Sequence, residues 1–152
     1  MATARDALLL FDGTCGFCAE SVQFVLAHES RARTLKFASL QSGVGARVRS
    51  AHPELDGVDS VIWYEPAAGA RGETILVRSG AVLHVLDYLG GVWRVLGWLA
   101  RIVPRVVRDA VYDLVARHRH RLVRGGQVCV LPSADQRRRF IDLSTEETVA
   151  SR

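Results

Sequence analysis

Residues 8–18, LLLFDGTCGFC, carry the main structural signal of this 152-residue sequence. An apolar run of strand length ends in an Asp-Gly pair, which favours a turn, and its unbroken apolar character indicates burial on both faces of a sheet. Two cysteines follow, and apolar residues then recur with helical spacing through Val22, Val25 and Leu26. The stretch therefore predicts a strand, a tight turn and a helix that begins near Cys15.

The predicted position of Cys15 suits a thiolate. The first N–H groups of a helix lack intrahelical partners, and together with the helix dipole they favour a negative charge. A thiolate attacks disulfides, and Cys18, one helical turn further on, is placed to be the resolving thiol of a mixed disulfide. We expect Cys18 to be the more buried of the two. The pattern indicates a thiol–disulfide oxidoreductase; two inert core cysteines are the alternative.

Asp12 has two interpretations that the sequence does not separate. In the first, its carboxylate lies partly buried under the cysteine pair and accepts the proton released when Cys18 attacks, which would make Asp12 catalytic. In the second, Asp12 only forms the turn and caps the helix, as aspartate often does before glycine.

Composition restricts the class of protein. The length suits one domain with its own core, and three cysteines exclude a fully paired disulfide framework within one chain. The net charge of +4 comes almost entirely from arginine, which permits binding to acidic partners without requiring it. Aromatic residues are not interleaved with the basic ones, so no nucleic-acid binding is expected. No signal peptide is visible, and the longest apolar region, 92–103, is too short to span a bilayer, so we expect a cytoplasmic protein.

The order of predicted elements indicates an α/β fold. Period and turn signals predict strands at 7–11, 34–38, 58–64 and 73–78, and helices at 15–28, 43–51 and 81–89. This βαβα-ββα order, with a central mixed sheet flanked by helices, is the plan of a thioredoxin-like fold.

A helical extension follows from about residue 90. It comprises a short apolar helix at 92–102, a long amphipathic helix at 104–122, a segment at 127–131 that carries Cys129, and a last helical turn or two within 134–143. We expect one domain over 1–143 and a flexible tail at 144–152.

Several motifs resemble the DCC family of predicted thiol–disulfide oxidoreductases, named for an Asp-x-x-Cys-x-x-Cys motif. The likeness extends over nearly the whole chain, in the order Asp12-Gly13-x-Cys15-Gly16-x-Cys18, Ser39-Leu40-Gln41-Ser42, Asp59-Ser60-Val61, Arg78-Ser79, Arg108-Asp109-x-x-Tyr112-Asp113 and Cys129-x-Leu131-Pro132. The resemblance implies a thioredoxin-like fold and disulfide exchange with a disulfide-containing protein or a small thiol. An unidentified electron donor would then reduce the cysteine pair again. It implies no cofactor.

The sequence departs from ordinary thioredoxins in one place that matters. Thioredoxins carry a cis-proline before the third strand, which helps to dock extended substrates and keeps metals off the cysteine pair; Asp59-Ser60 stands there instead. Metal or cluster binding is therefore one alternative, with Cys15, Cys18, Cys129 and either His118 or His120 as ligands of an allowed type, although their spacing matches no common zinc module. A non-catalytic thioredoxin-like binding module is the other alternative.

The helical extension offers weaker signals. The basic stretch 101–124, with His118 and His120, is interpreted as a solvated helix face. Trp93 and Trp98 are expected to be packing residues, and peripheral contact with acidic lipid is the lesser alternative. The sequence does not determine the oligomeric state.

Overall fold

Four strands form one mixed sheet at the centre of the molecule. The computed structural model describes residues 7–29, 34–67, 70, 72–122 and 133–142. The strands are β1 (Leu8–Phe11), β2 (Lys36–Ser39), β3 (Ile62–Glu65) and β4 (Thr74–Val77), in the order β2-β1-β3-β4. β1 is parallel to β2, and β3 is antiparallel to both β1 and β4. The chain enters β2 through a crossover helix, which is why these two strands are parallel.

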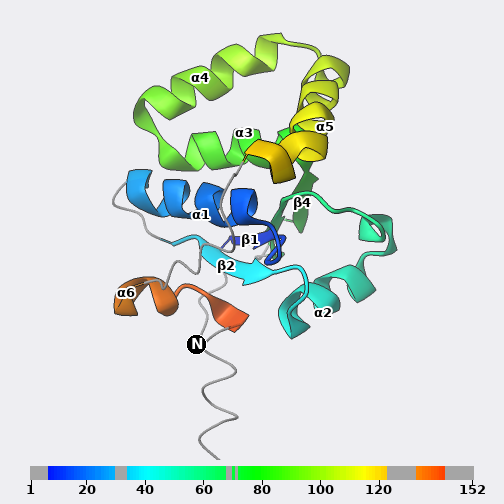
Figure 1. The fold of residues 1–152 in the computed structure, drawn as a ribbon, viewed down its shortest axis with the longest axis vertical. Helices are drawn as coiled ribbons and strands as arrows, with labels where there is room; N and C mark the ends of the chain where they lie inside the picture. Colours follow the sequence, from blue (N-terminus) through cyan, green and yellow to red (C-terminus); the bar gives the residue numbers. More distant parts are fainter. Residues whose placement is uncertain (1–6, 30–33, 68–69, 71, 123–132, 143–152) are drawn as a thin grey trace, which may run out of the picture.

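Helices cover both faces of this sheet (Figure 1). Leu9, Phe37 and Trp63 point to the face that is covered by α1 (Gly16–His28) and α3 (Arg78–Leu89). Leu10 and Ile62 point to the opposite face, which is covered by α2 (Gly43–Ala51) and the short 3-10 helix η1 (Pro53–Leu55). Because successive residues of a strand alternate between faces, the apolar run of β1 is buried on both sides, as predicted.

The helical extension lies beyond α3. It consists of α4 (Gly91–Ile102) and α5 (Arg105–Leu122), which form an arch over α1 and α3 (Figure 1). The predicted α/β class, βαβα-ββα order and helical C-terminal extension are confirmed. None of the helices in the described part of the chain combines the length and apolar character needed to cross a membrane.

Two elements begin at least three residues away from their predicted starts. α3 begins directly after β4 at Arg78, not at residue 81, because Arg78 takes the left-handed conformation (φ 53°) and turns the chain without a loop. β3 begins at residue 62, not 58. The backbone just before it bonds to side chains of α5 and not to a neighbouring strand, as the N–H of Val61 shows by donating to the Tyr112 hydroxyl at 3.1 Å.

The end of the described chain covers the outer edge of β2. Phe140 forms a parallel bridge with Phe37, and Arg139 pairs with Glu29 while donating to the carbonyl of Leu35. The helix predicted within 134–143 is shorter: α6 (Ala134–Arg137) starts with a capping box at Ser133 and ends before the bridge. The predicted segment at 127–131 and the tail at 144–152 lie outside the described residues.

Candidate functional site

The cysteine pair lies at the junction of β1 and α1, as predicted. Cys15 is the N-cap residue of α1 in an extended conformation, and its N–H donates to the carbonyl of Asp12 at 3.3 Å. None of the side chains that the structure describes caps this helix end. The N–H groups of the first turn therefore remain available to stabilise negative charge close to Cys15.

The two thiols lie close enough to interact, and their burial differs from the prediction. Cys15 is only 2% exposed, whereas Cys18 is half-buried, so the expectation that Cys18 would be the more buried residue is wrong. One turn into α1, Cys18 lies close enough to Tyr112 and Arg119 of α5 for their charges to influence one another. Burial, the hydrogen bond with Cys15 and the charge of Cys15 raise the pKa of Cys18 to about 12. Cys18 therefore stays protonated at neutral pH.

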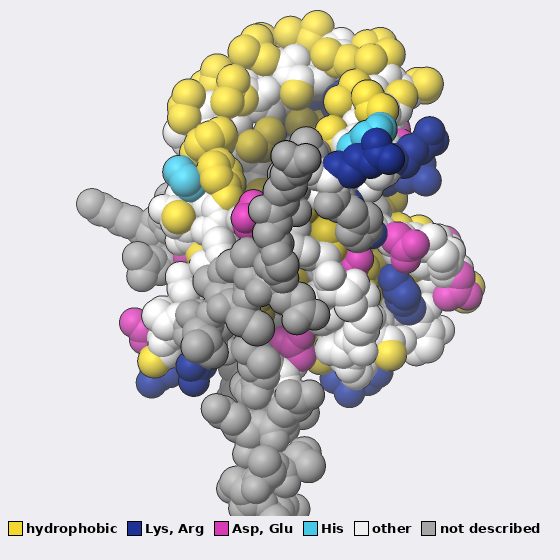
Figure 2. Space-filling view, in the orientation of Figure 1, with side chains coloured by type: hydrophobic (Ala, Val, Ile, Leu, Met, Phe, Trp, Pro, Cys, Tyr) yellow, Lys and Arg dark blue, Asp and Glu magenta, His cyan; other side chains and the backbone are white. Residues whose placement is uncertain are grey.

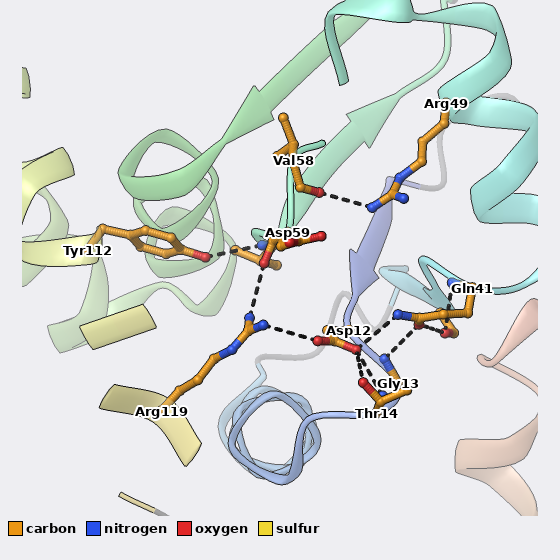
Figure 3. Close-up of polar contacts among 11 residues, drawn as sticks. Asp12, Gly13, Thr14, Gln41, Arg49, Val58, Asp59, Tyr112 and Arg119 are labelled. Atoms are coloured by element: carbon orange, nitrogen blue, oxygen red, sulfur yellow. Dashed lines mark hydrogen bonds and ion pairs between the residues drawn. The ribbon is translucent and has the colours of Figure 1, made fainter. Parts of the chain in front are cut away.

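Asp12 is fixed by contacts to both of its carboxylate oxygens (Figure 3). Oδ1 accepts from the Thr14 N–H at 2.9 Å, the Thr14 hydroxyl at 2.7 Å and Nε2 of Gln41 at 3.0 Å. Oδ2 pairs with Nη2 of Arg119 at 3.2 Å. Burial by itself raises the pKa of Asp12, but the hydrogen bonds from Thr14 and Gln41 and the charge of Arg119 outweigh it, so this pKa lies below its ordinary value.

A loop after β2 locks the turn that precedes the cysteines. Oε1 of Gln41 accepts from the Gly13 N–H at 3.1 Å and from the Ser39 hydroxyl at 2.6 Å. A Cβ atom at Gly13 would lie 2.6 Å from Oγ of Ser39, so the close approach of the two loops explains the glycine. These loops meet because the carboxyl ends of the parallel strands β1 and β2 lie at the same edge of the sheet.

Arg119 is the site residue that the sequence interpretation missed. Its side chain is 15% exposed, and besides pairing with Asp12 it donates through Nη1 to the Asp59 carbonyl at 3.0 Å (Figure 3). Placing it in a solvated basic helix end was therefore wrong, although Arg117 and His118 are exposed as expected. A signal existed: Arg119 follows Tyr112 by two helical turns and so lies on the same face of α5.

Tyr112 completes the contact between α5 and the segment before β3. Its hydroxyl accepts from the Val61 N–H, and its pKa is raised, first by burial and further by the neighbouring Cys18. Asp59 and Val61, on either side of the residue predicted to replace the thioredoxin cis-proline, therefore bond to Arg119 and Tyr112 of α5.

The described residues do not assemble the metal-ligand set that the sequence suggested. Among them, no three His, Cys, Asp or Glu side chains lie close enough to hold a metal ion. Cys129 and the side chain of His120 lie outside what the structure describes, so a set that includes them stays untested.

Comparison with known proteins agrees with the motifs. The family model described as DCC1-like thiol-disulfide oxidoreductase matches residues 9–125. The uncharacterized protein YuxK of Bacillus subtilis is 32% identical over 137 residues, which cover 90% of this chain and 94% of YuxK. The chloroplastic DCC family protein At1g52590 of Arabidopsis thaliana is 31% identical over 129 residues, 84% of this chain and 70% of that protein. No solved structure matches the chain.

Proposed function

The chain belongs to the DCC1-like thiol-disulfide oxidoreductase family, and we propose that it catalyses disulfide exchange with Cys15 as the attacking thiolate and Cys18 as the resolving thiol. The observation that carries this assignment is the asymmetry of the pair. Cys15 lies at the uncapped N-terminus of α1, whereas Cys18 has a pKa raised to about 12 and keeps its proton.

The exchange proceeds in two steps that balance without a cofactor. The Cys15 thiolate attacks one sulfur of the substrate disulfide, forming a mixed disulfide and releasing one substrate thiolate, which takes up a proton. Cys18 then loses its proton and attacks the sulfur of Cys15, which breaks the mixed disulfide and releases the second substrate thiol. Two electrons pass from the cysteine pair to the substrate, so an electron donor must reduce the Cys15–Cys18 disulfide before the next cycle.

The raised pKa of Cys18 fits the order of these steps. Besides burial, two of its causes are the hydrogen bond with Cys15 and the charge of Cys15. Both causes vanish once Cys15 is bonded to substrate, because a disulfide sulfur carries no charge. Cys18 therefore becomes easier to deprotonate at the point where it has to attack.

We assign Asp12 a positioning role. A carboxylate whose pKa is lowered is a poor proton acceptor, and its oxygens already bind Thr14, Gln41 and Arg119. These contacts favour the turn-forming interpretation of Asp12 over the proton relay. Arg119 lowers the pKa of Cys18 and Asp12 raises it, so the ion pair balances two opposite influences on the resolving thiol.

One observation favours a second candidate function. Cys15 exposes only 2% of its surface, and an inert buried pair would suit a thioredoxin-like binding module. In the redox assignment, we expect substrate to approach Cys15 over the turn that precedes it, because Gly13 and Thr14 are exposed. Alkylation with iodoacetamide separates the two: a module with an inert pair would react no faster at Cys15 than the denatured chain does.

The decisive experiment uses single cysteine variants in a disulfide reduction assay. We expect Cys15→Ser to abolish activity and Cys18→Ser to accumulate a mixed disulfide on Cys15, which mass spectrometry detects. Cys129→Ser serves as the matched control and should keep activity if the pair acts alone. Unchanged activity in Cys15→Ser would refute the assignment. Trapping cellular proteins on Cys18→Ser would then identify the substrate, a disulfide-containing protein or small thiol, in the reducing cytoplasmic compartment that we expect.

A further inference from the structure

An extended apolar surface covers the outer sides of α4 and α5. We name this surface the apolar ridge; its exposed members are Val92, Val95, Leu96, Trp98, Leu99, Ile102, Val103, Val106, Val107, Val111, Leu114 and Val115. The most exposed lie near the corner between the helices, with Ile102 at 69% and Val106 at 81%. In Figure 2 hydrophobic side chains follow the whole arch. Monomeric proteins rarely expose contiguous apolar surface on this scale without an interaction.

The ridge faces outward because both helices are attached to the protein by other residues. α4 approaches α3 through Gly97, where an added Cβ would lie 3.2 Å from Cβ of Leu86, and through the ion pair between Arg101 and Asp87 at 2.5 Å. These contacts do not involve the apolar side chains on the far side of α4, which stay exposed.

α5 is attached by polar groups in the same way. Ser79 of α3 donates to Asp109, Arg78 pairs with Asp113 at 3.7 Å, and Tyr112 and Arg119 bind the segment before β3. The apolar stripe of α5 therefore lies on the side away from the core. The long helix is amphipathic as predicted, but the side that packs against the protein is the polar one.

The charges beside the ridge have one sign. Arg94 on α4 and Arg117 and Arg121 on α5 are exposed. Within 91–122 the acidic residues are Asp109 and Asp113. Asp109 accepts from Ser79 and pairs with Arg105 at 3.4 Å, and Asp113 pairs with Arg78. The outer surface of this hairpin thus combines apolar side chains with arginines, and none of its carboxylates points outward unpaired.

We propose that the apolar ridge binds the surface of a membrane that contains anionic lipids. Helices that lie in a bilayer interface have this combination of aliphatic side chains and tryptophan on one side and arginine beside them. Neither α4 nor α5 has the length and apolar character needed to cross a bilayer. The ridge would enter the boundary between headgroups and acyl chains, and the arginines would contact lipid phosphates. Trp98, 61% exposed, would lie at headgroup depth and was wrongly expected to be a packing residue.

A second copy of the chain fits this surface less well. Joining two ridges would bring the arginines of both copies together, and the ridge offers no free carboxylate to compensate their charge. An anionic lipid surface supplies that charge.

Docking at the ridge does not use the cysteine site. The ridge occupies the outer side of α5, whereas Tyr112 and Arg119 bind the cysteine-bearing core with the inner side. Lipid binding and disulfide exchange can therefore be tested independently, and failure of one leaves the other standing.

Sedimentation of the full chain with lipid vesicles tests the proposal. We expect binding to vesicles of phosphatidylcholine with phosphatidylglycerol and at least about tenfold weaker binding to phosphatidylcholine alone or in high salt. The double substitution Ile102→Gln and Val106→Gln should weaken binding at least about tenfold, because the inserted side chains become polar. Both positions are exposed, so far-UV circular dichroism should not change.

A matched pair of charge variants tests the arginines. Arg94→Gln with Arg117→Gln removes two charges beside the ridge, and Arg47→Gln with Arg138→Gln removes two exposed charges near the opposite end of the molecule, on α2 and after α6 (Figure 1). Only the first pair should weaken binding to anionic vesicles.

Tryptophan emission gives a second readout that does not depend on sedimentation. Trp63 is buried and Trp93 half-buried, so quenching by brominated lipid should come from Trp98 and disappear in Trp98→Phe. The proposal fails if anionic vesicles do not pellet the protein, or if the Ile102 and Val106 double variant binds as well as the unsubstituted chain. It also fails if that variant only abolishes a dimer seen by analytical ultracentrifugation.

Discussion

α1 and α5 flank the cysteine pair and are attached to the protein by opposite means. α1 buries Val22 and Val25 in the core beneath the sheet and turns its N-terminus toward Cys15. α5 buries a polar side, with Tyr112 and Arg119 bonded to the loops around the site, and exposes its valines. Apolar packing tolerates small shifts, whereas an ion pair and hydrogen bonds fix positions and charges. α1 is therefore held by apolar packing, and α5 by an ion pair and hydrogen bonds that also place charges at the site.

The largest expected effect comes from breaking the polar attachment of α5. The side chains of Asp12 and Arg119 are 12% and 15% exposed, and Arg119→Leu leaves the Asp12 carboxylate without its ion-pair partner. The substitution also removes the hydrogen bond from Arg119 to the Asp59 carbonyl. We expect about 2–4 kcal/mol lower free energy of unfolding, measured in urea. Arg117→Leu, on the exposed side of the same helix, is the control and should change it by less than about 0.5 kcal/mol. Equal effects would show that α5 is not attached through Arg119.

A pair of valine substitutions compares apolar packing on the two helices. Val25 is 4% exposed and Val111 56% exposed. Val25→Ala should lower the free energy of unfolding by about 1.5–3 kcal/mol, because it leaves a cavity in the core. Val111→Ala should leave it unchanged or raise it by a few tenths, since about half a kcal/mol of helix propensity is gained. A loss at Val111 as large as at Val25 would mean that the outer side of α5 is covered in the isolated protein.

The smallest expected effect is the pH dependence that Asp12 contributes. Its pKa is lower in the folded chain than the ordinary value of 3.8, so its stabilising contribution is complete above about pH 5 and is lost as pH falls through the lowered pKa. Asp12→Asn should therefore be less stable than the unsubstituted chain at pH 7, and the difference should shrink toward pH 3. Circular dichroism during urea titration at both values measures it.

The same variant separates the two interpretations of Asp12. In the positioning role, Asp12→Asn leaves the shape of the pH profile of disulfide exchange unchanged. If the pH profile of the variant lacks one ionisation, the interpretation of Asp12 as a proton relay would be supported instead.

Most of the fold was accessible from local sequence signals. The strand at β1, the turn at Asp12-Gly13 and the start of α1 follow from periodicity and turn chemistry over adjacent residues, and so do α2, α4 and α5 within a residue or two. The bridge between Phe37 and Phe140 joins segments with no common local pattern, which is why the covering of β2 by the chain end was not predicted.

The cysteine pair was located from sequence because its chemistry depends on a local element, the first turn of a helix that follows a strand. The residues that surround the pair were not predicted from sequence. Arg119 reaches Asp12 across 107 residues, and the relative burial of Cys15 and Cys18 depends on how α5 lies against α1. The amphipathic pattern of α5 likewise showed that one side is apolar, but not which side packs. Periodicity is a property of one helix, whereas the direction in which that helix is buried depends on the free energy of all its contacts with the rest of the chain.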